Sequence, residues 1–321
     1  MGVKQLNRLF RTICVNGLKK TNLRELKNRK IAVDISIYMY KYKQQGDMID
    51  GIFNMITLFQ KYNIIPIFVF DGKPPIEKYN TLLERHNKKQ TAKTEYDKLL
   101  IEYTNVNTDT NNKTIMSGSH SFKLQKKLEM YKRDMTKLSY KDIVDVKKLI
   151  NFMGENYYES HIEADSIIAK LVKEKNVWGC MSEDMDMFVY GCPVVLRYFS
   201  IVKEDVVVYD LNKILLCLNL TYNEFKEICV LAGTDYNSQN IEFNIDFIMN
   251  KYIQYNNTNT HISFYEWFGE QNYVIDISRL NKISQMFNVN NVDLTKANYL
   301  KGCKNHKHMV ELLINYGFVF I

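Results

Sequence analysis

Apolar runs alternate with segments of helical periodicity near the start of the chain. The runs RKIAVDIS (29–36) and IIPIFVFD (64–71) predict two buried strands, which end on the acids Asp34 and Asp71. Between them, DMIDGIFNMITLFQKYN (47–63) carries apolar residues three and four positions apart, which indicates a helix. Two fully apolar strands joined by a helix are typical of a parallel βαβ unit.

The same alternation continues through the rest of the chain. It predicts further helices at 74–100, 123–138, 140–154, 163–175 and 221–233, and strands at 177–182, 193–199 and 205–210. We expect the last of these strands to lie at an edge of the sheet. The polar segment 103–121 lacks periodicity and is expected to be a mobile insertion, and residues 237–321 are expected to be helical at most. The predicted fold class is therefore α/β, with a twisted, mostly parallel sheet flanked by helices.

The positive charge of the chain is concentrated in one segment. Residues 72–148 hold 17 basic and 10 acidic side chains, so the other basic and acidic residues balance at 26 of each and the whole net charge of +7 comes from this segment. A localised basic stretch indicates a polyanionic partner. The alternative is that these lysines simply cover a solvated helix face.

Several classes of protein are disfavoured by the sequence. The longest apolar stretch, IIPIFVF (64–70), is too short to span a membrane, and the first 15 residues lack the apolar core of a signal peptide. The six cysteines show no C-x-x-C spacing, which favours reduced thiols in an intracellular protein. We expect no association with membranes.

Acidic residues recur at the ends of predicted strands and the starts of predicted helices. The carboxyl ends of parallel strands meet at one edge of a sheet, where ligands bind. We therefore expect seven acids to gather there: Asp34, Asp71, Glu163, Asp165, Asp184, Asp186 and Asp235. Seven carboxylates repel one another unless cations neutralise them, and oxygen ligands without His or Cys favour Mg²⁺ or Mn²⁺. Taken singly, each acid is also explained as a helix cap or as a complement to a helix dipole.

Six segments, in order, resemble the successive motifs of the flap endonuclease/XPG family of structure-specific 5′ nucleases. They are MGVKQL (1–6), IAVDIS (31–36), IIPIFVFDGKPP (64–75), IEAD (162–165), SEDMDMFVYGCPVVLR (182–197) and LAGTDY (231–236). The resemblance implies a PIN-like nuclease core at 1–236 with a helical arch at about 75–139. It departs from many members at Glu-Ala-Asp, where they have Glu-Ala-Glu.

The resemblance also implies an activity, which is Mg²⁺-dependent cleavage of DNA at flaps, nicks or 5′ ends in replication, repair or recombination. Two Mg²⁺ ions, for which Mn²⁺ can substitute, would be held by the seven acids. Lys78 and Arg85 would clamp the scissile phosphate. The implied substrate-binding residues are Gly2, whose amine supports the site, Tyr40, which stacks on a base, and Lys89 and Lys93 of the arch. A 5′→3′ exonuclease, a junction-resolving enzyme, an RNA-directed relative and a non-catalytic nucleic-acid-binding relative remain alternatives.

The C-terminal part departs most from the family. Residues 237–252 contain no glycine, whereas the family has a Gly-rich helix–two-turn–helix there, so we interpret 237–321 as a divergent helical region. The sequence offers no C-terminal sliding-clamp peptide, and we expect a monomer that binds branched or 5′-ended DNA. The Asn, Lys, Ile and Tyr bias suggests an AT-rich genome, such as that of a protist or a large DNA virus. The expected location is the nucleus, or a cytoplasmic factory if the protein is viral.

Overall fold

Eight strands form one mixed sheet within the described part of the chain, in the order β1-β7-β6-β5-β2-β3-β4-β8. The structure is a computed structural model that describes residues 2–108, 117–237, 243–258, 260–273 and 275–320. The strands are β1 (Leu18–Asn22), β2 (Lys30–Asp34), β3 (Ile65–Phe70), β4 (Asn156–Glu159), β5 (Gly179–Met181), β6 (Val194–Ser200), β7 (Asp205–Asp210) and β8 (Asn298–Leu300). The strands from β6 to β4 in this order run parallel, and β1, β7 and β8 pair antiparallel with their neighbours. The predicted α/β class and mostly parallel sheet are confirmed.

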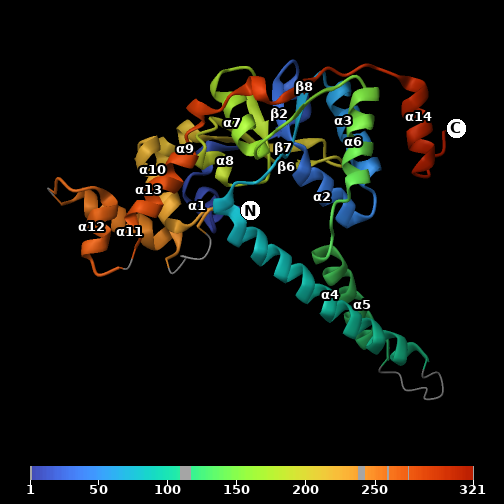
Figure 1. Cartoon of the computed structure of the whole chain (residues 1–321), viewed down its shortest axis with the longest axis horizontal. Helices are drawn as coiled ribbons and strands as arrows, with labels where there is room; N and C mark the ends of the chain where they lie inside the picture. The colour runs from blue at the N-terminus through green and yellow to red at the C-terminus, as the bar shows by residue number, and fades with distance from the viewer. Residues whose placement is uncertain (1, 109–116, 238–242, 259, 274, 321) are drawn as a thin grey trace.

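Helices cover both faces of the sheet (Figure 1). They are α1 (Leu6–Ile13), α2 (Ile35–Gln45), α3 (Met48–Lys61), α4 (Tyr79–Thr108), α5 (Ser117–Asp134), α6 (Tyr140–Phe152), α7 (Ala164–Lys173), α8 (Asp186–Val189), α9 (Leu211–Leu218), α10 (Tyr222–Ala232), α11 (Ile245–Asn256), α12 (Phe264–Glu270), α13 (Ile277–Met286) and α14 (His306–Asn315). Successive β2 residues point to opposite faces, as strand geometry requires. Ala32 therefore packs in one core with α1, α7 and α10, whereas Ile31 and Val33 pack in a second core with α2, α3 and α6. The sheet is thus the middle of three layers.

Two long helices project from these layers as an arm (Figure 1). A short 3₁₀ turn (Ile76–Lys78) leads into α4, and α5 packs back along it. Of the expected insertion 103–121, residues 103–108 belong to α4 and 117–121 to α5, while 109–116 lie outside the described residues. Helix α4 continues beyond its predicted end at 100, and α5 begins before its predicted start at 123 but ends at Asp134 rather than at 138. Because α4 is polar around most of its surface, hydrophobic periodicity does not mark where it stops.

The two edges of the sheet differ from the prediction. Strand β7 is not at an edge, because β1 pairs with it along its whole length. Strand β8 lies in the region expected to be helical at most, and it closes the opposite edge by pairing with β4. Both missed edge strands are short and mostly exposed, so they lack the apolar runs by which the central strands were found. The division of the chain at residue 236 stays a prediction.

The C-terminal helices pack on the layer that contains α10. Helices α11 and α13 contact α10, and the aromatic side chains of Phe264 and Phe268 are buried in the same core as the sheet residues. The C-terminal helix α14 instead packs against α6, on the other side of the molecule. None of the helices in the described ranges combines the length and the apolar character needed to cross a membrane.

Candidate nuclease active site

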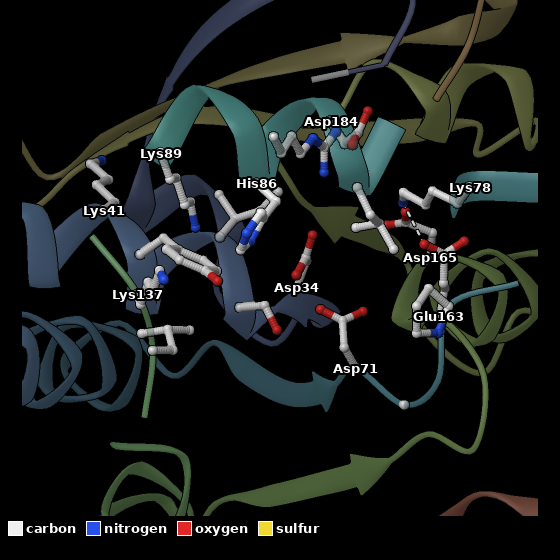
Figure 2. Close-up of a pocket in the computed structure, with 18 of the residues that line it drawn as sticks. Asp34, Lys41, Asp71, Lys78, His86, Lys89, Lys137, Glu163, Asp165 and Asp184 are labelled. Carbon is white, nitrogen blue, oxygen red and sulfur yellow. Dashed lines mark hydrogen bonds and ion pairs between the residues drawn. The ribbon is translucent and has the colours of Figure 1, made fainter. Parts of the chain in front are cut away.

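A cavity of about 840 Å³ lies at the carboxyl ends of the central strands, under the base of α4 (Figure 2). Five of the predicted acids line it, and we call them the acid wall: Asp34, Asp71, Glu163, Asp165 and Asp184. Three lysines lie on the opposite side, and we call them the lysine wall: Lys41, Lys89 and Lys137. One cavity therefore has carboxylates on one side and lysine side chains on the other, although the Lys41 ammonium donates to the backbone carbonyl of Phe199 at 3.0 Å.

The first two acids are placed by neighbouring strands. Asp34 is the last residue of β2, and Asp71 directly follows β3, which pairs with β2 in parallel. Asp34 accepts a hydrogen bond from the Ser182 hydroxyl at 3.1 Å. Asp71 accepts one at 3.0 Å from the backbone N–H of Ala164, at the start of α7. The predicted convergence of strand ends thus brings these two acids into one cavity.

The start of α7 contributes the next two acids. Glu163 is the N-cap residue of this helix, but its side chain makes no capping hydrogen bond. It instead pairs with the Lys78 ammonium and accepts a hydrogen bond from the Tyr236 hydroxyl at 2.8 Å. Asp165 lies one residue into the helix and faces the cavity. A helix cap therefore does not explain Glu163, because its carboxylate is directed toward the site.

Asp186 and Asp235 lie behind the acid wall rather than in it. Asp186 accepts hydrogen bonds from the backbone N–H groups of Val3, at 3.0 Å, and Asp235, at 3.3 Å. The N–H of Asp186 in turn donates to Asp184 at 2.9 Å. Asp235 pairs with Arg85 at 2.6 Å and with Lys78 at 3.5 Å. The structure therefore brings all seven acids into one region, although two of them do not line the cavity.

The N-terminal segment is built into this acid cluster. Gly2 has a φ of +73°, and its backbone N–H donates to Asp235 at 3.4 Å. A Cβ atom at this position would lie 2.3 Å from Asp184 Oδ1 and 2.5 Å from Asp186 Oδ1. Both the conformation and the close approach require glycine. Gly2 thus lies where the sequence comparison expected it.

Burial and mutual repulsion shift the pKa values of the acids. Burial and the nearby charge of Asp71 raise the pKa of Asp34 to about 8. Burial also raises the pKa of Asp165, Asp184 and Asp186, with neighbouring carboxylates adding to the effect. Burial alone would raise the pKa of Asp235, but Arg85 and Lys78 outweigh it and lower that pKa. Burial and mutual repulsion therefore disfavour the charged forms of Asp34, Asp165, Asp184 and Asp186, a cost that a bound cation would offset.

The donor set of the acid wall fits a hard divalent cation. Asp34, Asp71, Asp165 and Asp184 offer oxygen ligands to one cavity, which is the chemistry that Mg²⁺ and Mn²⁺ prefer. No three His, Cys, Asp or Glu side chains in the described ranges form a ready-made group around a metal ion. Glu163 and Asp235 are instead paired with Lys78 and Arg85. In these ion pairs a cationic side chain neutralises a carboxylate, as a bound metal ion would neutralise the carboxylates that remain unpaired.

The four cationic side chains proposed from the sequence differ in how close they lie to the acids. Lys78 is buried among the acids, where burial would lower its pKa but Glu163 and its neighbours raise it. Arg85 lines the cavity one turn beyond Leu82 on α4. Lys89 lies over the Tyr40 ring, 5.0 Å from its centre, and both line the cavity. Lys93 is exposed and lies outside the described residues that line the cavity.

The site also contains residues that were not proposed from the sequence. Lys41, Lys137 and His86 line the cavity, and Tyr236 holds Glu163 from behind. Position 78 in the 3₁₀ turn and positions 82, 85 and 89 in α4 are three or four residues apart, and His86 falls on the same face, so helical spacing contains this signal. No comparable signal marks Lys41 in α2 or Lys137 in the loop after α5, because lysines are common on protein surfaces.

Acids at the ends of parallel strands, with a helical arm above them, are the arrangement of PIN-like nucleases. Two family models match the chain, the XPG N-terminal domain over residues 1–92 and the XPG I-region over residues 154–235. Together they cover more than half of the chain. The protein therefore belongs to the XPG family, which includes the flap endonucleases.

Known proteins agree with this assignment. Flap endonuclease 1 of Encephalitozoon cuniculi is 30% identical over 253 residues, which are 74% of this chain and 68% of that protein. Flap endonuclease 1 of Glycine max is 29% identical over 255 residues, 74% of this chain and 62% of its own length. The match thus spans 62–68% of the length of these two relatives. The structure of the catalytic core of Rad2 in complex with DNA substrate shares the fold, with 20% identity, a TM-score of 0.64, and coverage of 99% of this chain and 95% of that one.

Proposed function

We propose that the protein is a Mg²⁺-dependent, structure-specific 5′ nuclease that hydrolyses DNA phosphodiesters at flaps, nicks or 5′ ends. The observation that carries the proposal is the single cavity with an acid wall and an opposite lysine wall. A carboxylate cluster alone would repel a phosphodiester, whereas lysine side chains on the other side of the same cavity attract it. The family membership and the relatives named flap endonuclease 1 support the same activity.

Lys78 and Arg85 are proposed to hold the scissile phosphate. Both now pair with Asp235, so a phosphate that enters the cavity would compete with that carboxylate for them. Arg85 can turn toward the cavity, because its side chain is 37% exposed, while Lys78 is held by Glu163. Charge-assisted contacts of this kind stabilise the negative charge that develops on the phosphoryl oxygens.

Asp34, Asp71, Asp165 and Asp184 are proposed to hold the divalent cations, with Glu163, Asp186 and Asp235 supporting them. Two bound Mg²⁺ ions would supply activation of the attacking water and neutralisation of the leaving oxygen. The hydrogen bonds from Ser182 to Asp34 and from Ala164 to Asp71 orient two of the ligands. Oriented carboxylates lose less freedom when they bind a cation.

Tyr40, Lys89 and Lys93 are proposed to hold the strand on the other side of the cut. The Tyr40 ring is 37% exposed and lines the cavity, so it offers a surface on which a base can stack. Lys89 and the more distant Lys93 follow α4 away from the site, which is a suitable path for the backbone of a single strand. The arm made by α4 and α5 would then serve as the arch.

The proposed partner is branched or 5′-ended DNA, bound by a monomer. The Rad2 core was solved with a DNA substrate, which supports binding of DNA by this fold. We propose the nucleus as the place of action, or a cytoplasmic factory if the protein is viral. A 5′→3′ exonuclease, a junction-resolving enzyme, an RNA-directed relative and a non-catalytic binder are the competing assignments.

The decisive experiment is cleavage of one set of end-labelled substrates in Mg²⁺. The set contains a 5′ flap, a nick, a gap, a four-way junction and an RNA version of the flap. We expect cleavage of DNA near the base of the 5′ flap, with products mapped by gel electrophoresis. Release of mononucleotides only would assign an exonuclease, and cleavage of the junction alone would assign a resolving enzyme. Binding without cleavage in either metal, Mg²⁺ or Mn²⁺, would contradict a catalytic role.

A further inference from the structure

A second cavity, of about 510 Å³, lies on the opposite side of the α4 base from the acid wall. Lys78, Leu82 and Arg85 face the first cavity, whereas Ile76 and Tyr79 line the second. The far wall of the second cavity comes from α13, in the C-terminal region, which lies beside α10 in Figure 1. The cavity therefore joins the arch base to a part of the chain that the proposed reaction does not use.

The lining of this second cavity combines apolar surface with positive charge. Ile76 is 84% exposed and Tyr79 is 61% exposed, so both side chains are accessible to a ligand. Arg279 and Lys282 lie three residues apart on α13, so they share one face of the helix. Neither forms an ion pair with any acid in the described ranges of the chain. Glu77 is the acid in the lining, so the charged side chains sum to +1.

This combination suits an unpaired nucleotide better than a duplex. An aromatic ring binds the face of any base, and neighbouring cations bind the phosphates on either side. The bases of a duplex are already paired and stacked, so they cannot enter a concave pocket without being extruded. The cavity volume is within the range of about 300–1,000 Å³ that is typical of small-molecule sites.

The two cavities share a wall. Tyr236 lines the second cavity, and its hydroxyl donates to Glu163 of the acid wall at 2.8 Å. The ammonium of Lys78, which faces the first cavity, lies 5.8 Å from the centre of the Tyr236 ring. A nucleotide in the second cavity would thus be separated from the acid wall by one side chain. This proximity argues for a strand that has one nucleotide in each cavity, on either side of Tyr236.

We propose that the second cavity binds an unpaired nucleotide of the cleaved strand, with its base on Tyr79 and its phosphates beside Arg279 and Lys282. The identity of the strand rests on the proposed nuclease function, whereas binding of single-stranded DNA does not. The site would favour substrates whose 5′ tail is long enough to reach it. A tail of a single nucleotide would gain nothing from it.

The test compares two 5′ flaps on the same duplex, one with a single unpaired nucleotide and one with a long oligothymidylate tail. We expect Tyr79→Ala and the double variant Arg279→Ala/Lys282→Ala to weaken binding of the long flap by about fivefold or more. Binding of the single-nucleotide flap should be unchanged. Tyr79→Phe keeps the ring and should behave as the wild type. The double variant Lys203→Ala/Lys296→Ala removes the same charge from exposed positions elsewhere and serves as the matched control.

Binding of free oligothymidylate in EDTA, followed by fluorescence anisotropy, separates this inference from the proposed function. The inference predicts the same loss of affinity for the two test variants there, even if no substrate is cleaved. Equal loss on both flaps would overturn it, because the residues would then contact the duplex. Unchanged binding of the long flap and of oligothymidylate would also overturn it. Absence of cleavage by the wild type would contradict the proposed function alone.

Discussion

The acid wall and the lysine wall face each other across one cavity, but the fold builds them in different ways. Asp34 and Asp71 are fixed by the hydrogen-bonded register of neighbouring strands, and hydrogen bonds to their carboxylates orient both side chains. Lys89 and Lys137 instead project from α4 and from the loop after α5 on long, flexible side chains, and Lys41 of α2 is held by one hydrogen bond to the Phe199 carbonyl. The comparison suggests a division of labour. Groups that must be positioned accurately for chemistry lie at the ends of central strands and at the start of α7. Groups that only need to attract a strand lie on α2, on α4 and in the loop after α5.

The largest predicted effect comes from removing one charge of the acid wall. Asp184→Asn keeps the shape of the side chain, and we expect the single-turnover cleavage rate of a 5′ flap to fall by about 10³-fold or more, because a cation ligand is lost. Binding of the same DNA in EDTA should persist or tighten, because a repulsive charge is gone. Cleavage at the wild-type rate in saturating Mg²⁺ would show that Asp184 is not a ligand.

Thermal unfolding gives a control for this variant that does not depend on activity. A cation that binds the folded protein stabilises it, by about 2.7 kcal/mol at a concentration 100 times its Kd. Mg²⁺ should therefore raise the Tm of the wild-type protein, and this increase should be smaller for Asp184→Asn. Glu174→Gln, at an exposed acid at the end of α7, is the matched control and should keep the full increase. The same increase in all three proteins would contradict cation binding at the acid wall.

A smaller effect on the cleavage rate is expected for Arg85, which lies between the acid wall and the lysine wall. Arg85 pairs with Asp235 but lines the cavity, so it can reach a bound phosphate. Arg85→Ala should slow the single-turnover rate by about 10²–10³-fold, as expected for the loss of one contact that stabilises the transition state. Arg85→Lys should recover part of the rate. If the rate at saturating enzyme were unchanged and only affinity fell, Arg85 would be a general phosphate contact.

Removal of the Tyr40 ring, which lies beside the lysine wall, should affect the affinity for DNA rather than the cleavage rate. Tyr40→Ala should weaken flap binding by about 5- to 150-fold, because stacking on an aromatic ring contributes about 1–3 kcal/mol per base. Tyr40→Phe keeps the ring and should bind as the wild type does. Equal losses in both variants, measured by anisotropy at fixed salt, would mean that the hydroxyl rather than the ring carries the contact.

The smallest predicted effects distinguish two lysines of α4. Lys89 lines the cavity and Lys93 does not. Lys89→Ala should reduce the slope of log affinity against log salt by about 1, as expected for one lost phosphate contact. Lys93→Ala should change it less. A larger change for Lys93 would place the strand further out along the arm than we propose.

The acid wall was predictable from the sequence because strand ends leave a clear signal. An apolar run marks each central strand, and an acid at its end must lie at the sheet edge, as Asp34 and Asp71 do. The distinction between lining and supporting acids was not predictable. Asp184 and Asp186 are two residues apart, yet only Asp184 lines the cavity, because Asp186 starts α8 and turns toward Val3. That difference depends on local backbone direction, which spacing does not encode.

The lysine wall and the sheet edges were less predictable, for related reasons. Lys41 and Lys137 resemble many other lysines in the sequence, and only the tertiary fold shows that they line the same side of one cavity. Strand β1 (LKKTN) has little apolar character and depends on β7 for its pairing. Strand β8 pairs with a strand roughly 140 residues earlier in the chain. Edge strands and helix surfaces are defined by their neighbours rather than by their own pattern.

The division of labour between the two walls can be tested most directly with one 5′-flap duplex, two variants and two readouts. Single-turnover rates in Mg²⁺ and dissociation constants in EDTA would be measured for Asp184→Asn and Lys89→Ala beside the wild type. We predict that Asp184→Asn loses the rate and keeps the affinity, and that Lys89→Ala loses affinity and keeps the rate at saturating enzyme. Parallel losses of rate and affinity in both variants would contradict the account, because the two walls would then act as a single binding site.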